Sequence, residues 1–180
     1  MTKEDKYLTV LVSLQSELGF KLHRAEDSKL IRKFVKKNFG ITLLNHIFLP
    51  EHWDSMSPRS RVALLLHEAQ HVRQQLRFGF GNIYLGFVLQ ALIYLLFPLP
   101  VGLAYGRARL EMDAYKETLR GYYLMSGKDL RVIADKDLED FIISQFTGPN
   151  YVYMWPFERS LRSWYNRAVS EVVEEERDDA

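Results

Sequence analysis

The sequence predicts an α+β fold that is predominantly helical. Apolar residues recur at helical spacing over residues 4–23, a second helix is expected over residues 27–38, and residues 59–78 contain no helix breaker. In contrast, the run ITLLNHIFLP (41–50) is rich in β-branched and apolar side chains and is bounded by a glycine and a proline, which is typical of a strand. We therefore expect long helices around a short β-strand or small sheet.

The chain is long enough for one domain of ordinary size, and we assign residues 1–170 to it. The last ten residues, 171–180, carry six acidic side chains against the single Arg177, a net charge of −5. They are expected to form an acidic, disordered tail. The amino-terminal residues have charges of both signs and no long apolar run behind them, unlike a secretory signal, so a cytoplasmic location is expected.

Overall charge and cysteine content restrict the classes of partner and of metal site. The formal net charge is +1, so no excess of lysine and arginine is available to neutralise phosphates, and nucleic acid is not an expected partner. The chain has no cysteine, which rules out disulfides and thiolate ligands. Any metal ion must therefore be held by imidazole and carboxylate groups.

The boundaries of the helix over residues 59–78 are marked by local signals. Ser57 is a good N-cap, and Pro58 suits the first helical position because its missing N–H is not needed there. Gly79 or Gly81 supplies the stop. We therefore expect one continuous helix between these residues.

Within this helix, the sequence HEAQH places His67 and His71 four residues apart. Residues four apart lie one turn apart on the same face, so both imidazoles can bind one ion. Glu68 lies about 100° farther around the helix, beside the ion, where its carboxylate can take a proton from metal-bound water. The neighbouring apolar residues imply burial, and an unpaired buried Glu68 would be costly, which favours a functional site over two merely packed or solvated histidines.

A catalytic zinc site needs a third protein ligand and an open fourth position. The downstream segment YGRARLEMDAYKETLRGYY (105–123) has a helical pattern and offers Glu111 as the candidate ligand. Asp113 and Glu117 are the alternative ligands in the same segment. The competing interpretation is that Glu111 is an ordinary surface glutamate.

Over residues 41–123, HEAQH followed by RARLEMDAY resembles the gluzincin metallopeptidases, the group that includes thermolysin and the CAAX-prenyl-protease-like enzymes. Less specifically, the segment is similar to uncharacterised bacterial metallopeptidases. The resemblance implies a zincin-like core, in which an antiparallel helix brings a glutamate ligand to the HExxH helix, and it gives that role to Glu111. In the family, an aspartate four residues later orients a zinc histidine, whereas Tyr115 stands there in this chain. Its hydroxyl could accept a hydrogen bond from a ring N–H of His67 or His71.

Residues 78–106 contain no charged side chain. If His71 and Glu111 bind one ion, a single membrane span here is excluded, because it would separate these two residues by about 30 Å of hydrocarbon. Two spans are also excluded, because they would need about 40 residues, more than the stretch has. Three interpretations remain: a helix buried in the core, which is preferred; a homo-oligomer or partner interface; or a membrane-surface contact through a hairpin turning at Pro98–Leu99–Pro100.

The segment FTGPNYVYMWPF (146–157) is rich in aromatic residues and is expected to cover the core, with a cleft wall or lid as the alternative. Tyr151 or Tyr153 could donate to the oxyanion that forms when water attacks a peptide carbonyl, and Arg107 and Arg109 are further candidates. Three other histidines are expected to have structural or surface roles, and the last of them directly precedes the HEAQH helix: His23, His46 and His52.

The sequence therefore predicts a zinc metalloendopeptidase that acts on a peptide or protein substrate. His67, His71 and Glu111 would bind Zn²⁺, and Glu68 would act first as general base and then as general acid. Zinc would polarise the scissile carbonyl and lower the pKa of its bound water towards about 7. Two alternatives compete with this prediction: a catalytically inactive zincin-fold interaction module, and a membrane-associated factor in which HEAQH is accidental.

Overall fold

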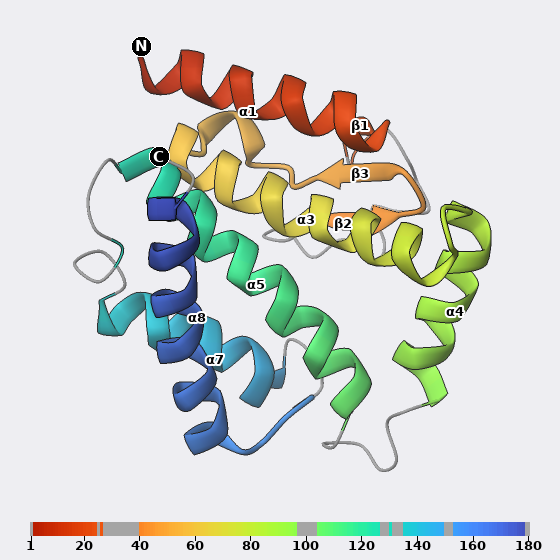
Figure 1. Cartoon of the computed structure of the whole chain (residues 1–180), viewed down its shortest axis with the longest axis vertical. Coiled ribbons are helices and arrows are strands. Elements are labelled where there is room, and N and C mark those ends of the chain that lie inside the picture. The colour runs from red at the N-terminus through yellow and green to blue at the C-terminus, as the bar shows by residue number, and fades with distance from the viewer. Residues whose placement is uncertain are drawn as a thin grey trace.

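The computed structural model describes residues 2–24, 26, 40–96, 104–126, 130, 135–149 and 153–178. Its helices are α1 (Lys3–Leu18), α3 (Pro58–Phe78), α4 (Ile83–Leu96), α5 (Tyr105–Ser126), α7 (Lys136–Thr147) and α8 (Glu158–Asp178), with a 3₁₀ turn η2 (Trp53–Ser55). Its strands are β1 (Lys21–Arg24), β2 (Ile41–Leu43) and β3 (His46–Leu49). Figure 1 shows α3 and α5 side by side, with α1 and the strands against α3 and with α7 and α8 beside α5. The predicted class, predominantly helical α+β, is confirmed.

The run over residues 41–50 forms two strands rather than one. β2 and β3 pair antiparallel around a turn at Leu44–Asn45, and β1 pairs parallel with the other side of β3. Leu44 has a left-handed backbone with φ 55°, which ends the extended conformation of β2. The resulting order, β1-β3-β2, leaves β2 as the strand next to α3.

Helix α1 is shorter than the expected helix over residues 4–23. It starts at a capping box, in which the side chains of Thr2 and Asp5 accept from each other's backbone N–H, and it ends at Gly19. Gly19 has φ 62°, and its N–H donates to the Gln15 carbonyl, so the chain leaves the helix and enters β1. The expected helix over residues 27–38 lies outside the described residues.

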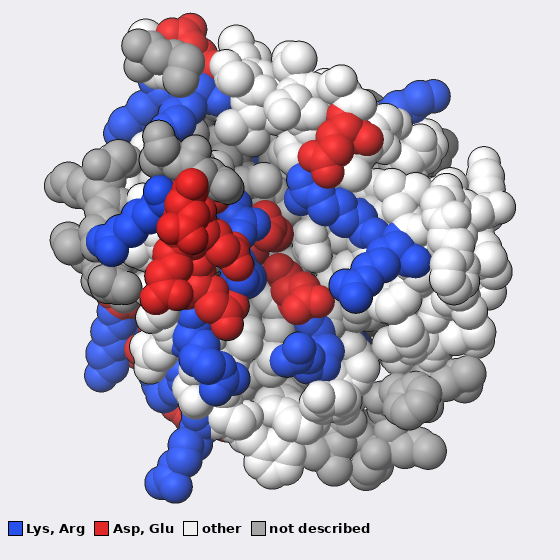
Figure 2. Space-filling model, viewed as in Figure 1, with Lys and Arg blue, Asp and Glu red and all other residues white. Residues whose placement is uncertain are grey.

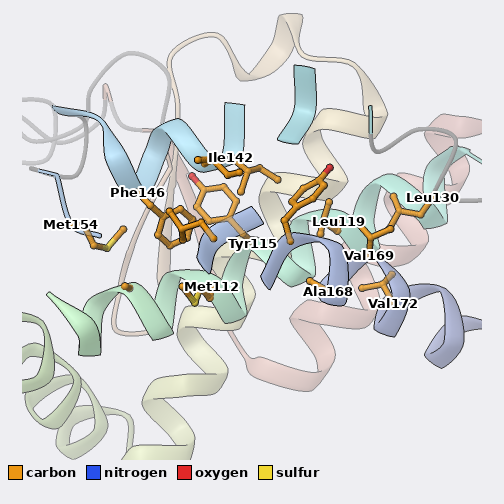
Figure 3. Close-up of a cluster of buried hydrophobic side chains, with 14 of the residues drawn as sticks. Met112, Tyr115, Leu119, Leu130, Ile142, Phe146, Met154, Ala168, Val169 and Val172 are labelled. Carbon is orange, nitrogen blue, oxygen red and sulfur yellow. The ribbon is translucent and has the colours of Figure 1, made fainter. Parts of the chain in front are cut away.

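Helices α3 and α5 approach closely because a glycine lies between their backbones. A Cβ atom on Gly121 of α5 would lie 2.6 Å from Cα of Ala63 on α3, closer than real Cβ atoms come. The two helices divide the buried side chains into two clusters. One cluster joins α1, the sheet and α3, and the other, drawn in Figure 3, joins α5, α7 and α8.

The expected disordered tail is wrong for residues 171–178, which continue helix α8. Val172 and Val173 are fully buried in the cluster with α5. On the neighbouring side of α8, Glu175 forms ion pairs with Lys116 and Arg120 of α5. The acidic composition suggested that this segment is solvated, but Val172 and Val173 pack it against α5.

The described part of residues 78–106 is not the buried core helix that the sequence favoured. Helix α4 packs one face on α3, where Gly86 lies against the Gln75 carbonyl and Gln90 is buried. The opposite face is exposed and apolar, and Pro98–Leu99–Pro100 lies outside the described residues. Within the described ranges, no single helix has the length and hydropathy of a membrane span. Helix α3 and residues 83–93 have that length and hydropathy only when taken together, and the two are bent by 103° relative to each other.

Candidate metal centre

The helix that carries HEAQH is placed by its own end signals. The Ser57 side chain accepts from the N–H of Ser60, Pro58 takes the first position, and Gly79 caps the last turn. The helix is uninterrupted between these ends, as predicted. His67 and His71 therefore lie one turn apart on the face of α3 that packs against α5.

Glu111 of α5 lies directly opposite the two histidines. One carboxylate oxygen is 3.6 Å from Nε2 of His67, and the other is 3.9 Å from Nε2 of His71. Among the residues that the structure describes, these three form the one group of histidine and acidic side chains whose ligand atoms converge, all within 4.8 Å of one another. The close approach at Gly121 and Ala63, farther along the same pair of helices, brings the ligand atoms this near.

The three side chains fit a divalent ion such as zinc. Metal–ligand bonds of about 2.0–2.2 Å in a tetrahedral site separate the ligand atoms by roughly 3.3 Å, so the two histidine–glutamate distances of 3.6 and 3.9 Å are only slightly longer than such a site requires. The side chains of His67, His71 and Glu111 are 9%, 12% and 3% exposed. Two imidazoles and one carboxylate are also a donor set that catalytic zinc sites use.

The tautomer of His67 is determined by Thr118. Nδ1 of His67 lies 3.1 Å from the Thr118 hydroxyl oxygen, and that hydroxyl is positioned to donate to the Ala114 carbonyl 3.4 Å away. The hydroxyl therefore accepts from His67, which places the ring proton on Nδ1. In the neutral ring, Nε2, the nitrogen that faces Glu111, therefore carries the lone pair that can bind a metal ion.

The tautomer of His71 is determined in the same way by Gln74. The amide nitrogen of Gln74 donates to the Leu110 carbonyl at 2.9 Å, so its oxygen faces His71 and accepts from Nδ1 at 3.0 Å. Gln90 of α4 donates to the same oxygen at 3.3 Å. Both candidate imidazole ligands therefore use Nδ1 for a protein partner and direct Nε2 toward Glu111, as the nitrogen that a metal ion can bind.

The electrostatic potential at the centre favours a cation. Burial alone would lower the pKa of His67, but the hydrogen bond and charge of Glu111, with a further contribution from Glu68, outweigh it and raise this pKa. A site that stabilises a proton on an otherwise buried imidazole also attracts a divalent ion, which would replace that proton.

Glu68 lies on the side of α3 that faces the edge strand β2. Its side chain is buried, and the Thr42 hydroxyl donates to its Oε2 at 2.7 Å. At Gly40, a Cβ atom would lie 2.7 Å from Oε1, so the absence of a side chain there makes room for the carboxylate. The buried Glu68 carboxylate therefore has a hydrogen-bond donor at Oε2, and the missing side chain of Gly40 leaves room for Oε1.

Tyr115, which stands where the gluzincin pattern has aspartate, packs its ring edge-on against the His67 ring at 4.7 Å between centroids. The same tyrosine packs against Phe146 of the α5–α7–α8 cluster at 5.5 Å (Figure 3). Its ring therefore connects that cluster to His67 and restricts the orientation of the imidazole. The Nδ1 atoms of His67 and His71 have Thr118 and Gln74 as their partners, not the Tyr115 hydroxyl that could have accepted from one of the rings.

The structure separates Glu111 from the alternative ligands on α5. Asp113 lies on the exposed side of the helix, and Glu117 forms an ion pair with Arg120. Glu111 is 2% exposed, so its interpretation as a surface glutamate is wrong.

The other predicted residues are not brought to the centre. No described contact joins Arg109 or Tyr153 to His67, His71 or Glu111; both are exposed, and Tyr153 is exposed by 54%. Tyr151 lies outside the described residues. His52 lies in the exposed turn before η2, whereas the remaining two histidines pair with each other, 2.7 Å apart across β1 and β3: His23 and His46.

Four residues of the centre were missed from sequence, and two of them had a detectable signal. Thr118 lies seven residues after Glu111, two turns along the same helical face, and Gln74 lies three after His71. Both therefore lie where partners for the histidines are expected. Thr42 and Gly40 come from a different element, so no spacing rule could find them.

In comparisons with protein-family models, curated proteins and solved structures, nothing matches this chain. The resemblance to gluzincins consequently rests on HEAQH and on the position of Glu111, and a metallopeptidase activity is a proposal based on the chemistry of these residues.

Proposed function

We propose that this protein is a zinc-dependent metallopeptidase. One observation carries the proposal: Nε2 of His67, Nε2 of His71 and the Glu111 carboxylate converge from two antiparallel helices, with Glu68 beside them on the first helix. Three protein ligands of this type leave a fourth position for water or substrate, as in catalytic rather than structural zinc sites. A buried acid next to the ligands supplies the base that such hydrolysis requires.

The proposed reaction is hydrolysis of a peptide bond. When bound, zinc supplies a Lewis acid that polarises the scissile carbonyl and makes water acidic enough to be deprotonated near neutral pH. Glu68 takes the proton from the attacking water and later delivers it to the amide nitrogen that leaves, so its carboxylate is regenerated. Thr42 orients Glu68 by donating to Oε2. Thr118 and Gln74 hold the two imidazoles in the tautomer that binds metal.

The first test is the metal content of the purified full-length protein, measured by inductively coupled plasma mass spectrometry. We expect about one zinc per chain, and Glu111→Gln is expected to lower zinc affinity by at least about tenfold because it removes the anionic ligand. Glu117→Gln is the matched control, since Glu117 is a largely buried glutamate of the same helix that pairs with Arg120. Equal zinc affinity in both variants would exclude Glu111 as a ligand.

The second test separates catalysis from metal binding. Glu68→Gln should leave zinc bound and lower the cleavage rate of a quenched-fluorescence peptide library by at least about a hundredfold, since the general base is lost. The Thr42 hydroxyl can still donate to the glutamine oxygen, so the fold should be retained. Turnover that persists at the wild-type rate in zinc-loaded Glu68→Gln would exclude the proposed role of Glu68.

The burial of the centre favours one second candidate, a structural metal site in a non-catalytic module. The ligand side chains are at most 12% exposed, and Glu68 is covered by Thr42 and lies against Gly40. On this alternative, zinc would stabilise the contact between α3 and α5 without turnover. Stoichiometric zinc with a large thermal stabilisation and no cleavage of any library peptide would favour it over the peptidase.

A further inference from the structure

The exposed face of α4 is apolar along its described length. Tyr84, Val88 and Leu92 follow one another at intervals of four, and Leu85 lies within the same arc of roughly 100° around the helix. These four side chains are 43–69% exposed, and Phe80, in the turn before α4, is 92% exposed. Figure 2 shows this side of the molecule, on the right, as free of charged atoms over the described part of α4.

The opposite face of α4 packs against helix α3. Gly86 lies against the backbone of Gln75, and Gln90 is buried and donates to Gln74. The helix therefore cannot rotate its apolar stripe inward without losing these contacts. A contiguous apolar stripe of this kind on a helix marks an interaction surface.

The charges around the stripe indicate what covers it. Between Glu68 and Glu111 the chain has four charged side chains, and all of them are arginines: Arg73, Arg77, Arg107 and Arg109. Arg73 is paired with Glu17, whereas Arg77 and Arg109 lie on the surface at the two ends of the uncharged segment. The exposed charges that flank the apolar segment on both sides are therefore positive.

We propose that the α4 surface, consisting of Phe80, Tyr84, Leu85, Val88 and Leu92, docks on an anionic lipid bilayer. An apolar helix face bounded by arginines matches the interface, where acyl chains take up the apolar side chains and acidic headgroups pair with the cations. A second copy of the chain would instead present the same two exposed arginines to this one. The docking does not depend on the proposed peptidase activity, because α4 supplies no metal ligand.

The proposal is tested by vesicle flotation with the full-length protein. One set of vesicles is phosphatidylcholine alone, and the other contains phosphatidylglycerol at about three parts in ten. We expect binding to the anionic vesicles that exceeds binding to neutral ones by at least about tenfold, since the two exposed arginines, Arg77 and Arg109, contribute at the surface. Equal binding to both sets, or no binding to either, would overturn the proposal.

Two valines provide a matched pair of variants. Val88→Asp places a charge in the α4 surface, whereas Val12→Asp places it on α1, where Val12 is 64% exposed compared with 53% for Val88. Val88→Asp should lower vesicle binding by at least about tenfold, and Val12→Asp should leave it unchanged. Leu92→Ser repeats the test without a charge, and circular dichroism checks that each variant is folded.

Two further outcomes would overturn docking on lipid. Equal losses in the Val88→Asp and Val12→Asp variants would show that the α4 surface is not the contact. Sedimentation velocity gives the other. If the protein does not float with vesicles but forms a dimer, and Val88→Asp dissociates that dimer, then a second copy covers α4.

Discussion

The Thr118 hydroxyl lies 3.1 Å from Nδ1 of His67, two helical turns along α5 from the carboxylate that faces Nε2 of the same ring. One face of one helix thus contacts both nitrogens of the imidazole: Thr118 accepts from Nδ1, and Glu111 faces Nε2. The position and tautomer of His67 are therefore determined by the packing of α5 on α3.

Thr118→Val is expected to weaken zinc binding. Valine keeps the shape of threonine but leaves the N–H of a buried imidazole without its acceptor, so zinc affinity should fall by about 10- to 100-fold. The metal-free protein should lose about 1–3 kcal/mol of unfolding free energy. Chelator competition and urea denaturation measure the two effects.

Thr147→Val is the control for this substitution, because Thr147 also donates to the carbonyl four residues earlier but lies on α7. An equal loss of zinc affinity in both variants would mean that Thr118 acts through general stability and not through His67.

Gln74→Leu is expected to affect His71 in a corresponding way. It removes the acceptor of Nδ1 and the donor to the Leu110 carbonyl, and it leaves the Gln90 amide without this acceptor. Zinc affinity measured by chelator competition should fall by about 10- to 100-fold. Gln145→Leu, at a glutamine of α7 that is equally buried, should leave zinc affinity unchanged. Unchanged affinity in Gln74→Leu would exclude the proposed tautomer control.

Gly121→Ala tests the close approach of α3 and α5. Helix propensity alone would stabilise the protein by up to about 1 kcal/mol. The new methyl group would meet the backbone of Ala63, however, and the resulting overpacking should cost about 1–3 kcal/mol. We therefore expect a net loss of stability in urea denaturation and a lower zinc affinity, since Glu111 moves away with α5. A gain in stability would contradict the described helix spacing.

Glu175→Gln tests the docking of the carboxy-terminal segment. The hydrogen bond and charge of Lys116, with Arg120 nearby, lower the pKa of Glu175 below its ordinary value of 4.5. A lowered folded-state pKa means that the contribution is present above that ordinary value and is lost as the pH falls through the folded value. Because Glu175 is partly exposed, the loss at neutral pH should stay below about 1 kcal/mol.

The measurement is unfolding free energy as a function of pH, which should decline less steeply below pH about 4.5 in the variant than in the wild type. Glu174→Gln, at the exposed neighbouring glutamate, is the control. Identical acid profiles for Glu175→Gln and wild type would show that residue 175 is not held by Lys116.

The HEAQH helix could be predicted almost completely because its signals are local. A serine N-cap, a proline at the first position and a following glycine act within one turn of each helix end. The same reasoning failed at Gly19, where a left-handed glycine ended α1 inside a continuing apolar pattern, and at Leu44–Asn45, where a turn divided one predicted strand into two.

Composition alone was a poor guide at the carboxyl terminus and in the apolar stretch. Residues 171–178 are mainly acidic, yet Val172 and Val173 bury this segment against α5. Conversely, α4 is apolar all round, yet only the face with Gly86 and Gln90 finds a partner within the described chain. Burial depends on which face another element covers, and composition does not carry that information.

The sequence by itself determined that two histidines four apart lie on one helical face with a glutamate beside them, because the helix has 3.6 residues per turn. Only the tertiary structure decided that Glu111, rather than Asp113 or Glu117, faces them. It also assigned Thr118 and Gln74 to the outer nitrogens of the two rings and Thr42 to Glu68. The physical reason is that a buried polar atom must find a partner in whatever packs around it: Thr118 reaches His67 because α5 packs closely on α3 at Gly121 and Ala63, and Thr42 reaches Glu68 because β2 packs on the other side of α3.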